Sequence, residues 1–251
     1  MSDESRAGRR RLSRNAVLAA ALSLADREGS AGLTMRALAR DLGVVPMALY
    51  KHVADKDELI DGMVDIVWSE VEAPVAAADQ SLWRPAMGAR AVSLRQALGR
   101  HPWAVGLMET RMHPGPANLA QHEAMMGCLR RAGFSFRATV HVTSVLDAYV
   151  YGFALQEMSL PFDSAEESGQ IAQQKLDAQP AELAAMFPYL IEVVSELATA
   201  GYDYDAEFNT GLNLILDAVE VLRPEWSRTN SRSPRRPASG AHVQQRPIAP
   251  S

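Results

Sequence analysis

Apolar residues recur at intervals of three and four along most of the chain, which is the spacing of helices that bury one face. In the first part of the sequence, capping and turn residues divide this pattern into four predicted helices. Their predicted starts are the N-caps Ser13 and Thr34, the first-turn Pro46 and the capping-box pair Asp55 and Glu58. Their predicted ends are Gly29 to Gly32, Gly43, His52 and a position ahead of Pro74.

The helical pattern continues after Pro74, and no segment makes a convincing β-strand. Pro188 lies inside one predicted helix and should kink or split it, because its ring clashes with the preceding turn. The last helix has the clearest apolar stripe, which runs from Phe208 to Leu222. These further helices are predicted near 82–100, 103–109, 116–131, 137–159, 181–199 and 204–222.

The pattern therefore predicts an all-α fold with a small N-terminal domain and a larger helical bundle. Residues 12–60 would form the small domain and residues 61–222 the bundle. Residues 1–11 form a polar, arginine-rich arm, and residues 223–251 form a tail rich in Pro, Ser and Arg. Both ends are predicted to be disordered, because they lack the apolar residues that would offset the entropy of ordering.

Composition narrows the class of protein. Only 6% of the residues are aromatic, while alanine and leucine are frequent, which suits packed helices. A single cysteine, Cys128, excludes an intramolecular disulfide and is compatible with a reducing cytosol. The sequence has no apolar signal region and no apolar run of membrane-spanning length. We therefore expect a soluble, cytoplasmic protein without a membrane partner.

The net charge of −5 is divided unevenly along the chain. Residues 1–60 carry 10 basic and 8 acidic residues, a net of +2, and residues 223–251 carry 6 and 1, a net of +5. Residues 61–222 then hold −5 − 2 − 5 = −12. An acidic body repels a polyanion, so any contact with nucleic acid is expected at the two ends.

Residues 33–56, LTMRALARDLGVVPMALYKHVADK, combine a helix, a glycine-containing turn and a short second helix. This helix-turn-helix arrangement lets the second helix enter the major groove of DNA. Leu38, Leu42 and Leu49 are predicted to lock the two helices together. The exposed side of the second helix would then carry Met47, Ala48, Tyr50, Lys51 and His52. Thr34 and Tyr50 can donate to phosphates, and Lys51 and Lys56 can neutralise them.

The run from Ser13 to Leu59 resembles the N-terminal domain of the tetracycline-repressor (TetR) family. The matching pieces are ALSLADREG, GLTMRALARDLGV, ALYKHV and DKDEL. The resemblance implies phosphate contacts for Thr34, Tyr50 and Lys56. It places near the bases or their flanking backbone the residues Arg36, Pro46, Met47, Ala48, Lys51 and His52. Val45 departs from the family, in which a polar or acidic residue often caps the recognition helix.

The resemblance continues into the body through HPWAVGLMETR, LRRAGFSFRATVHVTSVLDAYVYGFALQE and the helix at 204–222. It implies a small-molecule pocket and a homodimer in which helices 137–159 and 204–222 of each subunit form a four-helix interface. The predicted interface residues are Leu146, Val150, Phe208, Leu212, Ile215, Leu216 and Val219. Leu107 stands where the tetracycline repressor has a metal-binding histidine, so neither a bound metal nor another cofactor is expected.

The expected effector is an apolar or aromatic molecule, because methionine and aromatic side chains adapt to such ligands and a few polar groups orient them. The same residues at helical spacing would also fill an ordinary core, which the pattern alone favours. The candidate effector residues are Trp103, Leu107, Met108, Thr110, His113, Met125, Met126, Tyr149, Phe153 and Gln156.

These features predict a ligand-responsive DNA-binding regulator, a repressor that binds a palindromic operator as a homodimer. No catalytic residues are predicted, because the sequence lacks a phosphate loop, a GxSxG motif and zinc-ligand spacing. Two alternatives stay open at this point. One is a DNA-binding dimer without an effector, and the other is a helical-bundle ligand carrier or enzyme without a role at DNA.

Overall fold

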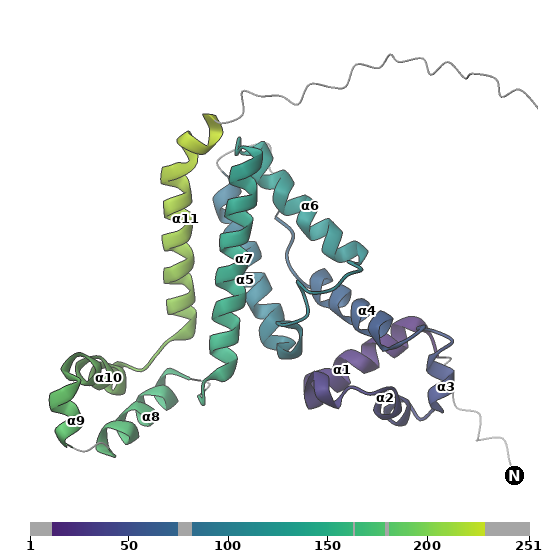
Figure 1. Cartoon of the computed structure of the whole chain (residues 1–251), viewed down its shortest axis with the longest axis horizontal. Helices are drawn as coiled ribbons and strands as arrows, with labels where there is room; N and C mark the ends of the chain where they lie inside the picture. The colour runs from purple at the N-terminus through teal and green to yellow at the C-terminus, as the bar shows by residue number, and fades with distance from the viewer. Residues whose placement is uncertain (1–11, 75–81, 163, 179–180, 229–251) are drawn as a thin grey trace, which may run out of the picture.

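The structure, a computed structural model, describes residues 12–74, 82–162, 164–178 and 181–228. Every regular element in these ranges is a helix, which confirms the predicted all-α fold (Figure 1). The predicted arm at 1–11 and residues 229–251 of the predicted tail lie outside the described residues. The elements are α1 (Arg14–Gly32), α2 (Met35–Asp41), α3 (Pro46–Leu49), α4 (Lys56–Ser69), α5 (Trp83–Arg100), the 3-10 helix η2 (Pro102–Ala104), α6 (Pro116–Arg131), α7 (Phe136–Ser159), α8 (Ala165–Asp177), α9 (Ala181–Met186), α10 (Pro188–Ala200) and α11 (Tyr204–Arg228).

The first helices begin where the capping residues predict. Ser13 Oγ accepts a hydrogen bond from the amide of Ala16 at 3.2 Å, and Thr34 Oγ1 accepts one from Ala37 at 3.1 Å. Asp55 Oδ1 accepts from the amide of Glu58 at 2.8 Å. These side chains satisfy amides that have no partner inside their helices. Val45, in contrast, gives α3 no side-chain cap, as its residue type predicts.

Helix α4 belongs to two cores at once. Leu59 and Met63, in its first half, are fully buried with α1, α2 and α3. Val67 and Trp68, in its second half, are fully buried in the larger core of the body. A domain boundary at residue 60 therefore falls inside a continuous helix, which couples the small domain mechanically to the body.

The body is built on α5, α6, α7 and α11. In Figure 1, α7 and α11 stand side by side, with α5 directly behind α7 and α6 on the side of α4. Its core contains apolar residues from all of these helices, among them Trp83, Leu94, Leu129, Leu146 and Phe208. The body thus uses the apolar stripe of α11 for packing within the subunit.

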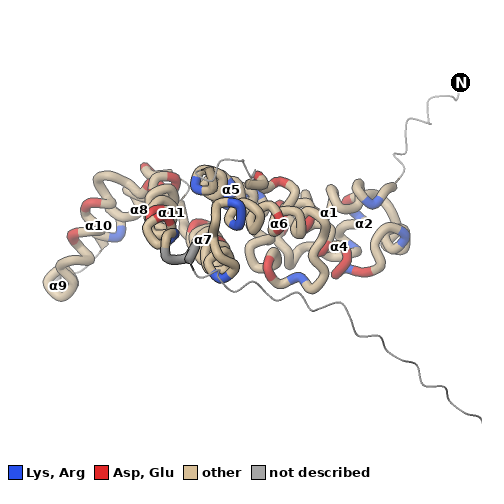
Figure 2. Tube along the Cα trace, turned by 90° about the horizontal axis from the view of Figure 1, so that it is seen from above, with Lys and Arg blue, Asp and Glu red and all other residues tan. Residues whose placement is uncertain are grey.

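Helices α8, α9 and α10 form a helical extension that lies at the opposite end of the molecule from α1 and α2 (Figures 1 and 2). The sequence pattern did not predict α8, because its short apolar face is interrupted by Ser, Gly and Gln residues. Ser164 nevertheless caps it, since its Oγ accepts from the amide of Glu167 at 3.2 Å. The helix predicted at 181–199 splits at Pro188 into α9 and α10, as the position of the proline predicts.

Three predicted boundaries are wrong. The segment 103–109 is a 3-10 turn followed by further turns rather than an α-helix. Helix α3 ends at Leu49, before the predicted His52. Helix α11 continues to Arg228 through Pro224, so residues 223–228 are helical and not part of a disordered tail. Contacts with distant residues hold this extension, because Arg223 Nη2 donates to the carbonyl of Ala132 at 2.8 Å and its guanidinium lies 5.7 Å from the centre of the Phe134 ring.

Candidate nucleic-acid interface and ligand cavities

The turn between α2 and α3 sets the angle of the two helices. Gly43 has a φ of 65°, a left-handed conformation that glycine adopts without steric cost. Its amide donates to the carbonyl of Arg40 at 3.1 Å, and the amide of Val44 donates to the carbonyl of Ala39 at 2.9 Å. Leu49, the last residue of α3, is fully buried in the small domain's core. The second helix is therefore held firmly although it is only 4 residues long.

Most of the residues predicted to contact DNA lie on the surface of this end of the molecule. Seven of the nine are exposed, and Ala48 and His52 are half-buried. The exposed residues are Thr34, Arg36, Pro46, Met47, Tyr50, Lys51 and Lys56. Met47 is 71% exposed and lies beside the exposed Val45 and Tyr50, so this surface carries apolar as well as basic side chains.

The basic residues at this end fall into two groups. Arg27 pairs with Asp41 at 3.0 Å, and Arg14 pairs with Glu58 at 3.3 Å, so both hold the domain together. In the described part of the chain, no ion pair engages Arg36, Arg40, Lys51 or Lys56 (Figure 2 shows the basic positions). Arg40 was not among the predicted contacts. It lies one turn after Arg36, so the helical spacing places the two on one face.

Helix α4 also supplies the N-cap of α6. Asp65 Oδ1 accepts from the amides of Ala117 at 2.9 Å and Asn118 at 3.0 Å, in the first turn of α6. The residue at the N-cap position of α6 is Gly115, which has no side chain to cap the helix. A carboxylate there also interacts favourably with the helix dipole. The first turn of α6 is thus fixed to the helix that leaves the small domain.

Two carboxylates, on α4 and α1, make further contacts with the segment between α5 and α6. Asp61 of α4 accepts from Arg111, and this hydrogen bond raises the pKa of the arginine above its ordinary value. Asp26 of α1 accepts from Trp103 Nε1 at 2.7 Å and lies 2.8 Å from His101 Nδ1. Trp103 is therefore a connection between the body and α1. A cavity of about 610 Å³ opens at this junction and is lined in part by His113, Asp61 and Asp65.

The ten predicted effector residues do not converge on one cavity. Met108 and Met125 are packed in the core, and Leu107 packs against it. Tyr149 and Phe153 face α11, where the Tyr149 ring stacks on Phe208 with centroids 5.4 Å apart. Thr110, His113, Met126 and Gln156 are exposed.

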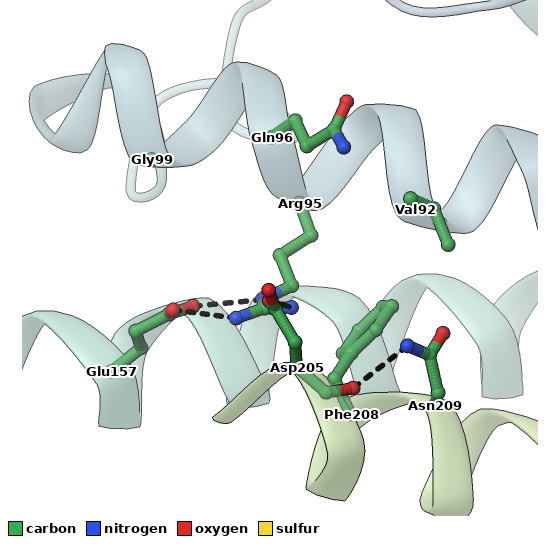
Figure 3. Close-up of a pocket in the computed structure, with 8 residues that line it drawn as sticks. All are labelled: Val92, Arg95, Gln96, Gly99, Glu157, Asp205, Phe208 and Asn209. Atoms are coloured by element: carbon green, nitrogen blue, oxygen red, sulfur yellow. Dashed lines mark hydrogen bonds and ion pairs between the residues drawn. The ribbon is translucent and has the colours of Figure 1, made fainter. Parts of the chain in front are cut away.

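Figure 3 shows a polar cavity of about 330 Å³ between α5, α7 and α11. Arg95 occupies its centre, and Nε and Nη2 donate to the two carboxylate oxygens of Glu157 at 2.9 and 2.6 Å. Nη1 donates to Asp205 at 2.7 Å, and the guanidinium lies 4.9 Å from the centre of the Phe208 ring. The hydrogen bond to Glu157 raises the pKa of Arg95. This residue joins three helices and has its charge fully matched.

A second arginine of α5 lies deeper. Arg90 is 1% exposed and donates from Nη1 to Asp147 of α7 at 2.8 Å. One turn further along α7, Tyr151 donates to the exposed Glu109 at 2.8 Å, and burial raises the pKa of the tyrosine hydroxyl. None of these residues was among the predicted site residues. Its only signal is an arginine on the apolar face of α5 between Met87 and Leu94.

The structure also changes the place of the predicted dimer residues. Six of the seven are buried within the single chain, and Ile215 is half-buried. They fill the space between α11, α7 and α5, so their stripe is the subunit's own core. The outward faces of α7 and α11 carry other exposed apolar residues, including Val145, Leu155, Leu214 and Val221.

In the ranges that the structure describes, three or more His, Cys, Asp or Glu side chains do not gather as a metal site requires. Within the same ranges, the structure has no helix with the length and apolar character needed to cross a membrane.

Known proteins resemble the chain in both of its parts. Residues 17–63 match the family model of bacterial regulatory proteins of the tetR family, and residues 75–223 match the tetracyclin repressor-like C-terminal domain. The HTH-type transcriptional repressor DrrR1 of Streptomyces coeruleorubidus is 32% identical over 82% of this chain and 76% of the relative. The tetracycline repressor protein class A from transposon 1721 of Escherichia coli is 29% identical over 85% and 93% of the two chains. The crystal structure of Streptomyces coelicolor ActR in complex with actinorhodin has a TM-score of 0.70 at 28% identity and covers 86% and 98% of the two chains.

Proposed function

Because the chain belongs to the TetR family of bacterial transcriptional regulators, we propose that it is a repressor that binds a palindromic operator as a homodimer and leaves it when an organic effector binds. The relatives named above are regulators, and the proposal gives this chain no catalytic role.

The observation that carries the proposal is the exposed surface from α2 to the start of α4, with its basic side chains. Arg36, Arg40, Lys51 and Lys56 have no ion pair among the described residues, while other basic residues nearby are matched. DNA phosphates would supply the missing negative charge. Met47 and Tyr50 project from α3 beside these cations, where they would approach the bases and the backbone.

Two copies of α3 would have to lie about 34–36 Å apart to enter successive major grooves. We propose that the outward faces of α7 and α11 hold two subunits at that separation. Exposed small and apolar residues recur on these faces at helical spacing, a pattern that packs helices against a partner. They are Val145, Ala148, Gly152 and Leu155 on α7 and Leu214, Ala218 and Val221 on α11.

An effector would act through the contacts of α4. Asp61 and Asp65 tie this helix to the segment before α6 and to α6 itself. A ligand changes DNA affinity only if it binds one arrangement of these helices more tightly than the other. A relative with this fold, ActR, binds actinorhodin. Leu107 is apolar and packs against the core, so we propose an effector that needs no divalent metal.

The test measures binding to DNA from upstream of the protein's own gene, by fluorescence anisotropy over a range of salt concentrations. Lys56→Ala and Lys51→Ala should weaken binding to specific and non-specific DNA alike. Each lost phosphate contact should reduce the log–log salt slope by about 0.9, or about 1.8 for two subunits.

The third lysine of the chain, Lys175, provides the matched control. It lies on α8, at the opposite end of the molecule from α1 and α2. Lys175→Ala removes the same charge and should leave the salt slope unchanged. A protein that binds DNA with no dependence on salt, or loses equal affinity in all three variants, would contradict the proposal.

A further inference from the structure

Buried polar atoms without a partner mark a place that a ligand can complete, because such atoms cost free energy when they lack hydrogen bonds. Among the described residues, five buried side-chain atoms have no hydrogen-bond partner. Two of them, Nε and Nη2, belong to Arg90, and Trp68 and Gln121 contribute one each. All three residues lie in the body, on α4, α5 and α6.

The two free nitrogens of Arg90 form one edge of its guanidinium. The opposite nitrogen, Nη1, is the one that donates to Asp147 at 2.8 Å. Arg95, on the same helix, shows which chemical group fits such an edge. In Arg95, the same Nε and Nη2 donate side by side to the two oxygens of the Glu157 carboxylate, at 2.9 and 2.6 Å. Parallel bonds of this kind select planar pairs of oxygens.

From this geometry we infer that the effector carries a carboxylate, whose two oxygens accept from Nε and Nη2 of Arg90. The inference rests on the proposed function, since it describes the molecule that would relieve repression. The remainder of the ligand would be apolar or aromatic, because Met87, Ala91 and Leu94 surround Arg90 on the same face of α5 and are buried.

Polar side chains lie on the α7 side of Arg90, between it and the surface. Glu109 is exposed and accepts from Tyr151, which is half-buried and lies one turn from Asp147 on α7. Asp147 itself retains 16% exposure of its side chain, against 1% for Arg90. Asp147 and Tyr151 of α7 therefore place polar groups beside and one turn beyond the Arg90 contact, and Glu109 continues them to the surface. The inference thus adds an anionic group to the apolar or aromatic effector that the sequence predicts.

The experiment compares three probes of similar size, which are 2-naphthoate, its neutral amide and the cationic 2-naphthylmethylamine. Their dissociation constants are measured by calorimetry on the full-length protein without DNA. The wild-type protein should bind naphthoate about tenfold more tightly than the amide, or better, which is the scale of a charge-assisted hydrogen bond. Arg90→Gln should abolish this preference, and Arg90→Lys should keep part of it.

Asp147→Asn is the decisive second variant. It removes a negative charge beside Arg90 and should strengthen the binding of naphthoate while leaving the amide unchanged. If Arg90 and Asp147 only hold the fold together, both variants would lower thermal stability and neither would change the order of the probes. That result, an unchanged preference in Arg90→Gln, or no binding of any probe would overturn the inference.

The proposed function can fail separately. If naphthoate binding follows Arg90 but the protein does not bind DNA, the repressor proposal falls and the carboxylate site stands. If DNA binding is normal and naphthoate shows no preference, only the inference falls.

Discussion

Gly211 controls how closely α11 approaches α7. A Cβ at this position would overlap the hydroxyl of Tyr149. That hydroxyl donates to the carbonyl of Phe208 at 2.9 Å, and the tyrosine ring stacks on the Phe208 ring. The absence of one methyl group therefore permits both a hydrogen bond between the helices and an aromatic contact in the core.

We predict that Gly211→Ala lowers the free energy of unfolding by about 1–3 kcal/mol, because the added methyl group must displace Tyr149. Urea unfolding followed by circular dichroism measures the change. Gly99→Ala is the control, since a Cβ there meets no atom within 4 Å. In α5 that substitution should be neutral or stabilise the protein by up to about 1 kcal/mol. Equal destabilisation by the two substitutions would show that the contact with Tyr149 is unimportant.

Some helices of this protein are capped or held in place by residues that are distant in the sequence. Helix α6 has Gly115 at its N-cap and takes its capping carboxylate from Asp65 of α4. Helix α11 is held at its first turn by Arg95 of α5, which also binds Glu157 of α7. Such contacts fix the relative positions of helices, whereas caps from adjacent residues fix only where each helix begins.

Asp65→Ala should remove the cap of α6 and lower the free energy of unfolding by about 0.5–2 kcal/mol. Hydrogen exchange should accelerate at Ala117 and Asn118, whose amides lose their acceptor. Glu123→Ala provides the control, because it removes one negative charge from an exposed position on α6 itself. If Glu123→Ala accelerates exchange at the same amides equally, charge and not capping explains the effect.

At the scale of the whole molecule, the small domain and the body differ in charge. The small domain presents cations that form no ion pair within the described ranges, while residues 61–222 carry a net charge of −12 and would repel DNA. Specific binding to a palindrome also needs a second subunit, and the outward faces of α7 and α11 carry the exposed apolar residues suited to that contact.

Leu214→Glu should convert the proposed dimer into a folded monomer, because Leu214 is 67% exposed in the single chain. Light scattering after size-exclusion chromatography measures the mass. Leu119→Glu places the same charge at another exposed leucine, on α6, and should leave the dimer intact. Leu216→Glu, at a buried position, should instead unfold the subunit, because an unpaired charge would enter the core. A dimeric Leu214→Glu protein would place the interface elsewhere.

The sequence alone predicted the starts of the first four helices, the helix-turn-helix and the family. Ser13, Thr34 and Asp55 act on amides three residues away, so their effect is encoded locally. The split at Pro188 is equally local, because the proline ring conflicts with its own preceding turn. The family resemblance identified the two domains, because each of its motifs is a short run of adjacent residues that can be recognised without the fold.

The tertiary structure decided which partner each face meets. The stripe from Phe208 to Val219 is equally suited to a core or to an interface, because both exclude water from apolar side chains. Its packing against α7 and α5 assigns it to the core. Likewise, Arg90 becomes a candidate ligand contact only through its burial and its single bond to Asp147, 57 residues away. Periodicity records which residues share a face, and only the folded chain determines what covers it.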